Sequence, residues 1–145
     1  MRTRILFIAT NFFAALSFLW PFLSLSIPQS LLERSFISIA IIVIAVVIIA
    51  SEISEQLLDS KTVAIIGVLA AAIAALRLLG AGAIGIEPIW FLLILASRVF
   101  GARLGYSLGV IALAVSAIIT GGIGPWLAFQ MFAAGWVAAG VALLP

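Results

Sequence analysis

The feature that most constrains this chain is a series of long apolar runs separated by short polar or glycine-rich segments. The first run extends from Ile5 to Leu25, and similar runs recur up to the C-terminal residues. A helix needs about 20 apolar residues to cross the hydrocarbon core of a bilayer, whereas a membrane β-barrel shows segments of about 10 residues that alternate in polarity. Because these runs are long and do not alternate, they predict membrane-spanning helices.

Composition supports this prediction. Hydrophobic residues make up 66% of the 145 residues and charged residues 8%, against about 45–50% and about 25% in soluble domains. We therefore expect an all-α integral membrane protein of the plasma membrane, with about six helices in one transmembrane domain. The expected spans cover residues 5–25, 36–54, 62–79, 86–100, 104–120 and 126–144.

Two of these spans have an alternative interpretation. The first ends in the small-x-small sequence Ser24 to Ser26, which resembles a signal-peptide cleavage site, but its apolar run exceeds the usual h-region of about 7–15 residues. A retained span is therefore favoured. The fourth, at 86–100, is short and starts at Glu87 and Pro88, a pair typical of a helix N-terminus. It either begins within the preceding glycine-rich segment or forms a half-helix among its neighbours.

The distribution of basic residues predicts the orientation. With six spans and a cytoplasmic N-terminus, five Lys and Arg residues fall inside and two, Arg34 and Arg77, fall outside, which agrees with the positive-inside rule. This topology places the connections 80–88 and 121–125 at the outer face. The net charge of +2 is too small and too dispersed to predict a nucleic-acid partner.

The residue types that are missing exclude most chemistry. The chain has no Cys and no His, which removes thiol nucleophiles, imidazole bases and the usual zinc ligands. It also lacks the phosphate-binding sequence G-x-x-x-x-G-K-[ST]. We therefore expect no enzymatic activity, no metal and no cofactor, and any energy from ATP must come from another chain.

Arg77 and Glu87 are the charges that need an explanation, because each lies in or beside an apolar segment, where a charge at mid-membrane costs about 2.5–3.5 kcal/mol on insertion scales. They either form an internal ion pair, with Arg77 alternatively extending to the headgroups, or point into an outward-facing solute pocket. Trp90, Trp126 and Gln130 are the expected companions in that pocket, since aromatic walls with a few polar groups suit a small ligand. The indoles are alternatively interfacial anchors.

Glycines define two further features. The loop glycines are expected to give the outer connections their irregular backbone; they are Gly80, Gly82, Gly85, Gly121, Gly122 and Gly124. Gly101, Gly105 and Gly109 are spaced by four residues, which predicts a GxxxG-type ridge. That ridge packs either within the chain or against another subunit.

The second half of the chain resembles the S components of energy-coupling factor transporters, in a group common in actinobacteria. The similarity covers about Lys61 to Pro145, and the first two spans match only in character. The motifs that carry it are Ala74-Ala75-Leu76-Arg77-Leu78-Leu79-Gly80 with the sequence up to Pro88, Arg98-Val99-Phe100-Gly101, Thr120-Gly121-Gly122-Ile123-Gly124-Pro125-Trp126, and Phe129-Gln130-Met131.

This resemblance implies an importer subunit that captures a vitamin-like micronutrient from outside the cell. A separate transmembrane T component and a pair of cytoplasmic ATPases would then drive release of the solute inward. Ala128 stands where similar sequences often have proline, and such proteins usually continue past the position of Pro145, so we expect this chain to be C-terminally truncated. The alternatives are a stand-alone secondary carrier or channel, or a structural membrane subunit.

Overall fold

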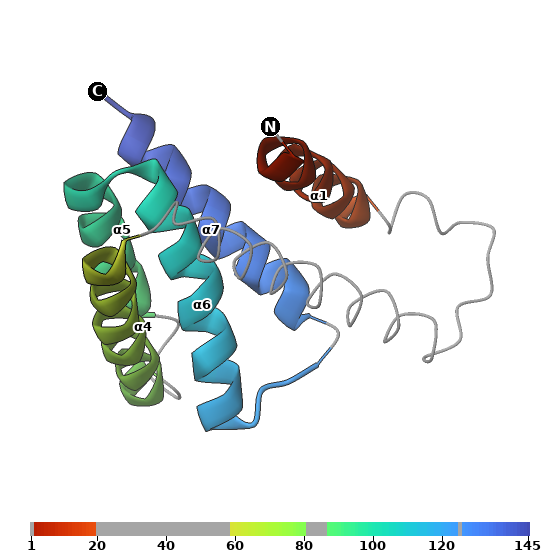
Figure 1. Ribbon diagram of the computed structural model, residues 1–145. Coiled ribbons are helices and arrows are strands. Elements are labelled where there is room, and N and C mark those ends of the chain that lie inside the picture. The colour runs from red at the N-terminus through yellow and green to blue at the C-terminus, as the bar shows by residue number, and fades with distance from the viewer. Residues whose placement is uncertain (1, 20–58, 81–86, 125) are drawn as a thin grey trace, which may run out of the picture.

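The structure, a computed structural model, describes residues 2–19, 59–80, 87–124 and 126–145 (Figure 1). Within these ranges every regular element is a helix and no strand occurs, which confirms the expected all-helical fold for this part of the chain. The helices are α1 (Arg2–Phe18), α4 (Ser60–Gly80), α5 (Ile89–Phe100), α6 (Ala102–Thr120) and α7 (Leu127–Leu143). The predicted span 36–54 and the end of the first one, 20–25, lie outside the described residues.

Two of these helices are long and apolar enough to cross a membrane, α4 over Ser60–Leu78 and α6 over Ala102–Thr120. Helices α1, α5 and α7 are also apolar but shorter. Helix α5 has 12 residues, so it is about 18 Å long at 1.5 Å per residue, against a hydrocarbon core of about 30 Å. The described part of α5 therefore has the length expected of a half-helix.

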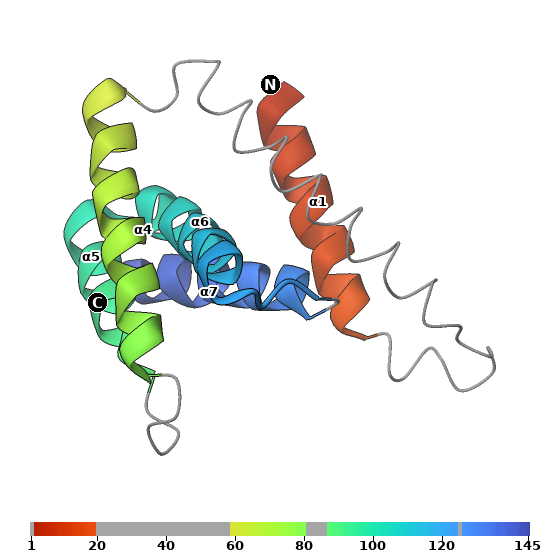
Figure 2. The ribbon, with the colours of Figure 1, turned by 90° about the horizontal axis from the view of Figure 1, so that it is seen from below.

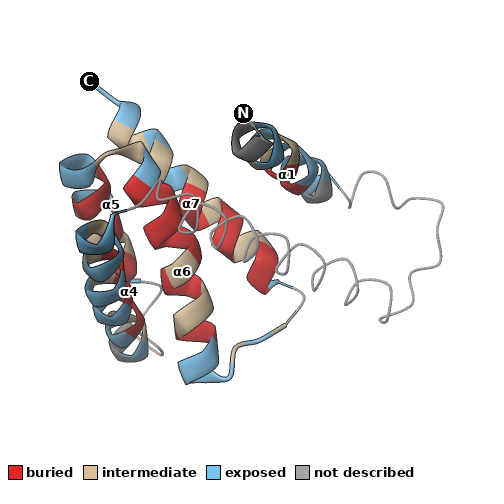
Figure 3. Ribbon diagram, in the orientation of Figure 1, coloured by how far each residue is buried: buried red, intermediate tan, exposed pale blue. Residues whose placement is uncertain are grey.

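Helix α6 forms the centre of the described fold. Helices α4, α5 and α7 pack against it, and α1 lies to one side, next to α7 (Figures 1 and 2). Burial follows this arrangement, because most of α6 is buried while the outer face of α4 is exposed (Figure 3). The largest fully buried side chains come from α4 to α7 and include Ile73, Leu93, Leu108 and Phe132.

The small-residue ridge of α6 permits this close packing. A Cβ atom on Gly109 would lie 2.7 Å from the carbonyl carbon of Ala134 in α7, and one on Gly105 would lie 2.5 Å from Oγ of Ser97 in α5. Ser97 is itself buried and donates its hydroxyl to the Leu93 carbonyl at 2.6 Å. Gly105 and Gly109 therefore let α5 and α7 approach α6 within the same chain, as close-packed membrane helices do. Gly101, the third glycine of the predicted ridge, precedes α6, and a Cβ there would meet nothing within 4 Å.

Glycines also lie at the ends of α5 and α6. Gly101, between α5 and α6, has φ 89°, and Gly121, which ends α6, has φ 68° with its N–H donated to the Ala117 carbonyl. Residues with a Cβ avoid this left-handed region. A glycine at each position lets the chain turn immediately after a helix, so that α5, α6 and α7 pack as consecutive neighbours.

Candidate functional site

A polar contact joins α4 to α7 in the otherwise apolar bundle. The Arg77 guanidinium donates from Nη2 to Oε1 of Gln130 over 3.4 Å, and both side chains are half-buried. Arg77 lies in the last turn of α4 and Gln130 one turn into α7. The structure therefore brings together two residues predicted for the site, beside the ends of the two glycine-rich connections.

Local structure explains both positions. A basic residue in the last turn of a helix interacts favourably with the negative end of the helix dipole, and Arg77 is the basic residue of that turn in α4. The Gln130 backbone N–H is bonded to the Trp126 carbonyl at 3.0 Å, so the amide projects from regular helix. Its side-chain oxygen faces the Arg77 guanidinium of α4.

Most of the hydrogen-bonding capacity of Arg77 is unused by this contact. A guanidinium has five N–H donors, and among the described residues Arg77 makes only the bond to Gln130. That bond is long, and its acceptor is a neutral amide, so within the described residues nothing compensates the positive charge. The described surroundings of Arg77 therefore favour an additional acceptor, preferably an anionic one.

Glu87 does not supply this acceptor. It lies on the surface just before α5, whose N-cap is Pro88, and its carbonyl accepts the Trp90 N–H at 3.3 Å. In the part of the chain that the structure describes, no ion pair joins Glu87 to Arg77. The ion pair considered from the sequence is not seen in this structure.

Among the described residues, neither predicted indole is hydrogen-bonded to Arg77 or Gln130. Trp90 is half-buried and packs against the hydrophobic core. Trp126 is 55% exposed, and its ring lies over Gly124, where an added Cβ would be 2.5 Å from the ring. Neither indole makes a ring or cation contact with Arg77 in the described structure. Their orientation suits an interfacial position at least as well as a pocket wall.

The loop glycines lie beside the polar pair along the chain. Gly80 is the last residue of α4, three residues after Arg77, and Gly82 and Gly85 are outside the described residues. Gly121 ends α6, and Gly122 donates its N–H to the Ala117 carbonyl at 3.0 Å. The connection from α6 to α7 therefore begins with a glycine turn at Gly121 and Gly122.

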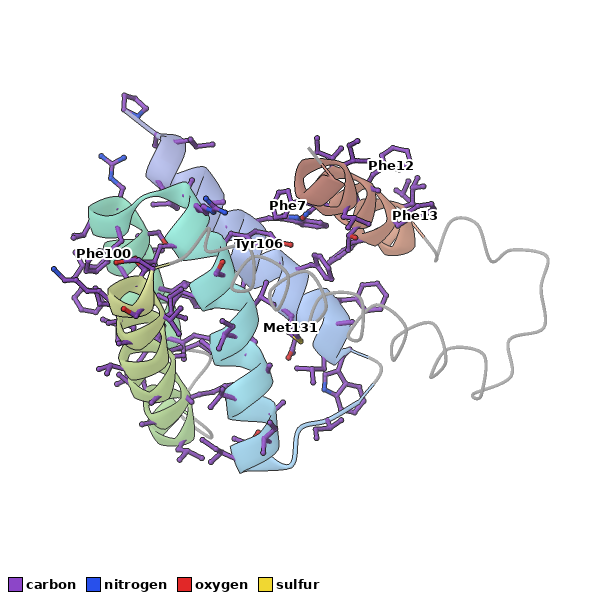
Figure 4. The ribbon with its side chains drawn as sticks, viewed as in Figure 1. Phe7, Phe12, Phe13, Phe100, Tyr106 and Met131 are labelled. Carbon is purple, nitrogen blue, oxygen red and sulfur yellow. The ribbon has the colours of Figure 1, made fainter. Side chains whose placement is uncertain are left out.

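Sequence reasoning missed a second polar cluster, which is centred on Asn11 of α1. Its Oδ1 accepts the Trp136 indole N–H at 2.7 Å and the Tyr106 hydroxyl at 3.0 Å. Its amide nitrogen donates to the Phe7 carbonyl at 2.9 Å. One side chain thus ties α1 to both α6 and α7, and Figure 4 shows Phe7 and Tyr106 between these helices.

Aromatic rings surround this cluster. Phe7 packs edge-on against Tyr106 with ring centroids 5.0 Å apart, and Phe18 contacts Phe129 at 5.0 Å and Trp136 at 5.2 Å. An amide within the first apolar run was the available signal, because an amide in lipid needs a partner. The partners lie 95 and 125 residues away in the sequence, so the sequence does not identify them.

Asp59 starts α4. Its Oδ1 accepts the Thr62 N–H at 3.2 Å, and its carbonyl accepts the Val63 N–H at 3.0 Å. Hydrogen bonding from the Thr62 side chain, and secondarily from its backbone, lowers the pKa of Asp59 although slight desolvation opposes the change. Asp59 therefore acts as an ionised helix cap.

Comparison of the chain with protein families, with curated proteins and with solved structures gives no match. Among the described residues no group of three or more His, Cys, Asp and Glu side chains could hold a metal ion. The strongest candidate for a functional site is consequently the contact between Arg77 and Gln130.

Proposed function

We propose that this chain is the membrane-embedded solute-binding subunit of an importer of the energy-coupling factor type. It captures a vitamin-like micronutrient from outside the cell, and a T component and an ATPase pair on other chains drive the uptake. The observation that carries this proposal is the contact between Arg77 and Gln130, which places an amide beside a cation that no carboxylate of the described residues pairs with.

A lipid environment accounts for the exposed apolar side chains of α4. In the most apolar stretch of α4, only 22% of the residues are buried within the described fold. Val68, in the middle of that helix, is 71% exposed. The core helix of a soluble protein would bury such residues, because exposed apolar area costs about 25 cal/mol per Å² in water. Hydrocarbon removes that cost, so a position in the membrane is supported by the exposed side of α4.

The position of the charge favours binding over simple packing. Arg77 lies close to the end of a helix that is long enough to cross a membrane. A charge buried there is costly, and such residues commonly face a solute path. A residue that only joined α4 to α7 could be a neutral amide, which would form the same type of hydrogen bond with Gln130 without the desolvation cost.

The proposed topology has six spans in the plasma membrane, a cytoplasmic N-terminus and outward glycine-rich connections. The contact between the last turn of α4 and the first turn of α7 agrees with both connections lying on one side. The sequence has no ATP-binding loop, which agrees with a division of labour between subunits.

Identification of a bound solute tests the proposal. The protein is purified in mild detergent from its native membranes, denatured, and its small-molecule extract is analysed by mass spectrometry. We expect one micronutrient in an amount approaching one per chain, and T component and ATPase subunits among the co-purifying proteins. The absence of any such compound, together with unchanged uptake after deletion of the gene, contradicts the proposal and favours a structural subunit.

A further inference from the structure

We infer that the solute carries an oxyanion, a carboxylate or a phosphoryl group, which Arg77 binds while Gln130 positions the guanidinium. This inference rests on the proposed function and specifies the substrate class for the same site. It begins from the geometry of one contact, in which Nη2 of Arg77 lies 3.4 Å from Oε1 of Gln130 and both side chains are half-buried.

The charge balance at this contact points to an anion. The Arg77 side chain is a guanidinium cation with donors only. In the described part of the chain no carboxylate faces it, since Glu87 is exposed and is not paired with Arg77. A half-buried cation with a neutral partner has lost part of its hydration without gaining an opposite charge. An anionic ligand would offset this free-energy cost.

The shape of the guanidinium narrows the class of anion. Its planar fork matches the two oxygens of a carboxylate or of a phosphoryl group in a bidentate arrangement. Gln130 occupies one donor of Nη2, which leaves the remaining edge of the fork for a ligand. Because the amide oxygen is an acceptor, it fixes the orientation of the guanidinium without neutralising it.

A lipid headgroup is another source of the same oxyanion. Arg side chains near a membrane surface extend toward lipid phosphates, and Arg77 is close to the end of α4. The half-burial of Arg77 and its bond to a residue of the facing helix favour a ligand inside the protein over a headgroup at its rim. The experiment therefore has to distinguish a soluble acid from a phospholipid.

The test compares the compounds that co-purify with matched variants. Wild type, Arg77→Gln, Gln130→Glu and Arg98→Gln are purified in parallel, exchanged into nanodiscs of phosphatidylcholine, and extracted for mass spectrometry in both ion modes. Arg98 is the control for loss of an arginine, because it is exposed and hydrogen-bonds the Val141 and Leu144 carbonyls near the end of α7. Circular dichroism verifies that each variant is folded.

We expect one water-soluble acid in wild type and Arg98→Gln. In Arg77→Gln its amount falls by about tenfold to a hundredfold, since a hydrogen bond to a charged group contributes about 1.5–3 kcal/mol. Gln130→Glu should also lose the acid, because the new carboxylate would compensate Arg77 from within the chain. A purely structural Arg77 predicts the opposite for Gln130→Glu, namely a retained or strengthened contact and unchanged solute.

Three other results would each refute one part of the account. A neutral or cationic solute, or an acid whose amount is unchanged in Arg77→Gln, refutes the inferred substrate class and leaves the proposed importer function intact. An anionic phospholipid as the one compound lost in Arg77→Gln refutes a soluble acid at this site. The absence of any solute from wild type refutes the proposed function itself.

Discussion

Replacement of Gly109 by alanine should separate α6 from α7. The added Cβ would lie 2.7 Å from the carbonyl carbon of Ala134 and 2.8 Å from the N atom of Gly135, about 0.8 Å short of an ordinary carbon contact of about 3.5–4.0 Å. Both obstacles are backbone atoms, so no side chain can rotate away. The helices must move apart, which costs about 1–3 kcal/mol for overpacking of this kind.

A second alanine variant isolates this steric cost. Gly140 lies in α7, and a Cβ there would meet nothing within 4 Å. Both substitutions gain about 0.8–1.0 kcal/mol of helix propensity, so this gain cancels in their comparison and the difference of about 1–3 kcal/mol is the packing term. Reversible unfolding in mixed micelles of dodecyl maltoside and SDS, followed by circular dichroism, measures the difference. Equal stability of Gly109→Ala and Gly140→Ala would refute the close approach of α6 and α7.

Four further outcomes are expected. Asn11→Ala removes two hydrogen bonds that hold α1 and should lower the free energy of unfolding by about 1–3 kcal/mol in the same assay. Tyr106→Phe removes one of these bonds and should lower it by less. Equal values for the two variants would count against Asn11 as the shared acceptor. Gly121→Ala should lower the free energy of unfolding by about 1–2 kcal/mol because the φ of Gly121 is 68°, although an added Cβ would meet no atom within 4 Å. An unchanged stability would contradict the left-handed conformation of Gly121. Folding lowers the pKa of Asp59, so its contribution to stability is present above the carboxyl's ordinary pKa and is lost as pH falls through the lowered one. The protection of the Thr62 N–H from hydrogen exchange, relative to the intrinsic rate at each pH, should therefore fall in acid; an equal fall in Asp59→Asn would disprove this cause. The chain has no native cysteine, so single cysteines can report the topology. Under the proposed topology, Ile123→Cys should react with an impermeant maleimide on whole cells, and Lys61→Cys only after lysis. The reverse pattern would show the opposite orientation.

The all-helical character was predictable because it depends on local sequence. Apolar runs without alternation leave the backbone no alternative to a helix in lipid, and four of the predicted segments coincide with α4 to α7 within about three residues at each end, an error usual for helix boundaries. The glycine spacing likewise indicated where helices could approach one another. Gly105 and Gly109 lie where an added Cβ would collide with α5 and α7.

The pairing of side chains was not predictable. Arg77 and Gln130 were each singled out because a polar group is costly in an apolar segment, but they are 53 residues apart. They meet because α4 and α7 both pack against α6. Proximity in the sequence suggested Glu87 as the partner of Arg77, and the fold leaves that carboxylate on the surface. Asn11 was overlooked because a single amide in a long apolar run changes its hydropathy little.

The most direct test of a solute site at Arg77 is a cryo-electron microscopy map of the protein in nanodiscs, purified with its solute and bound to a rigid antibody fragment for size. We predict density for a small molecule within hydrogen-bonding distance of the Arg77 guanidinium, with Gln130 still in contact with that side chain. A guanidinium turned out to the lipid headgroups, or solute density located elsewhere in the bundle, would contradict this prediction.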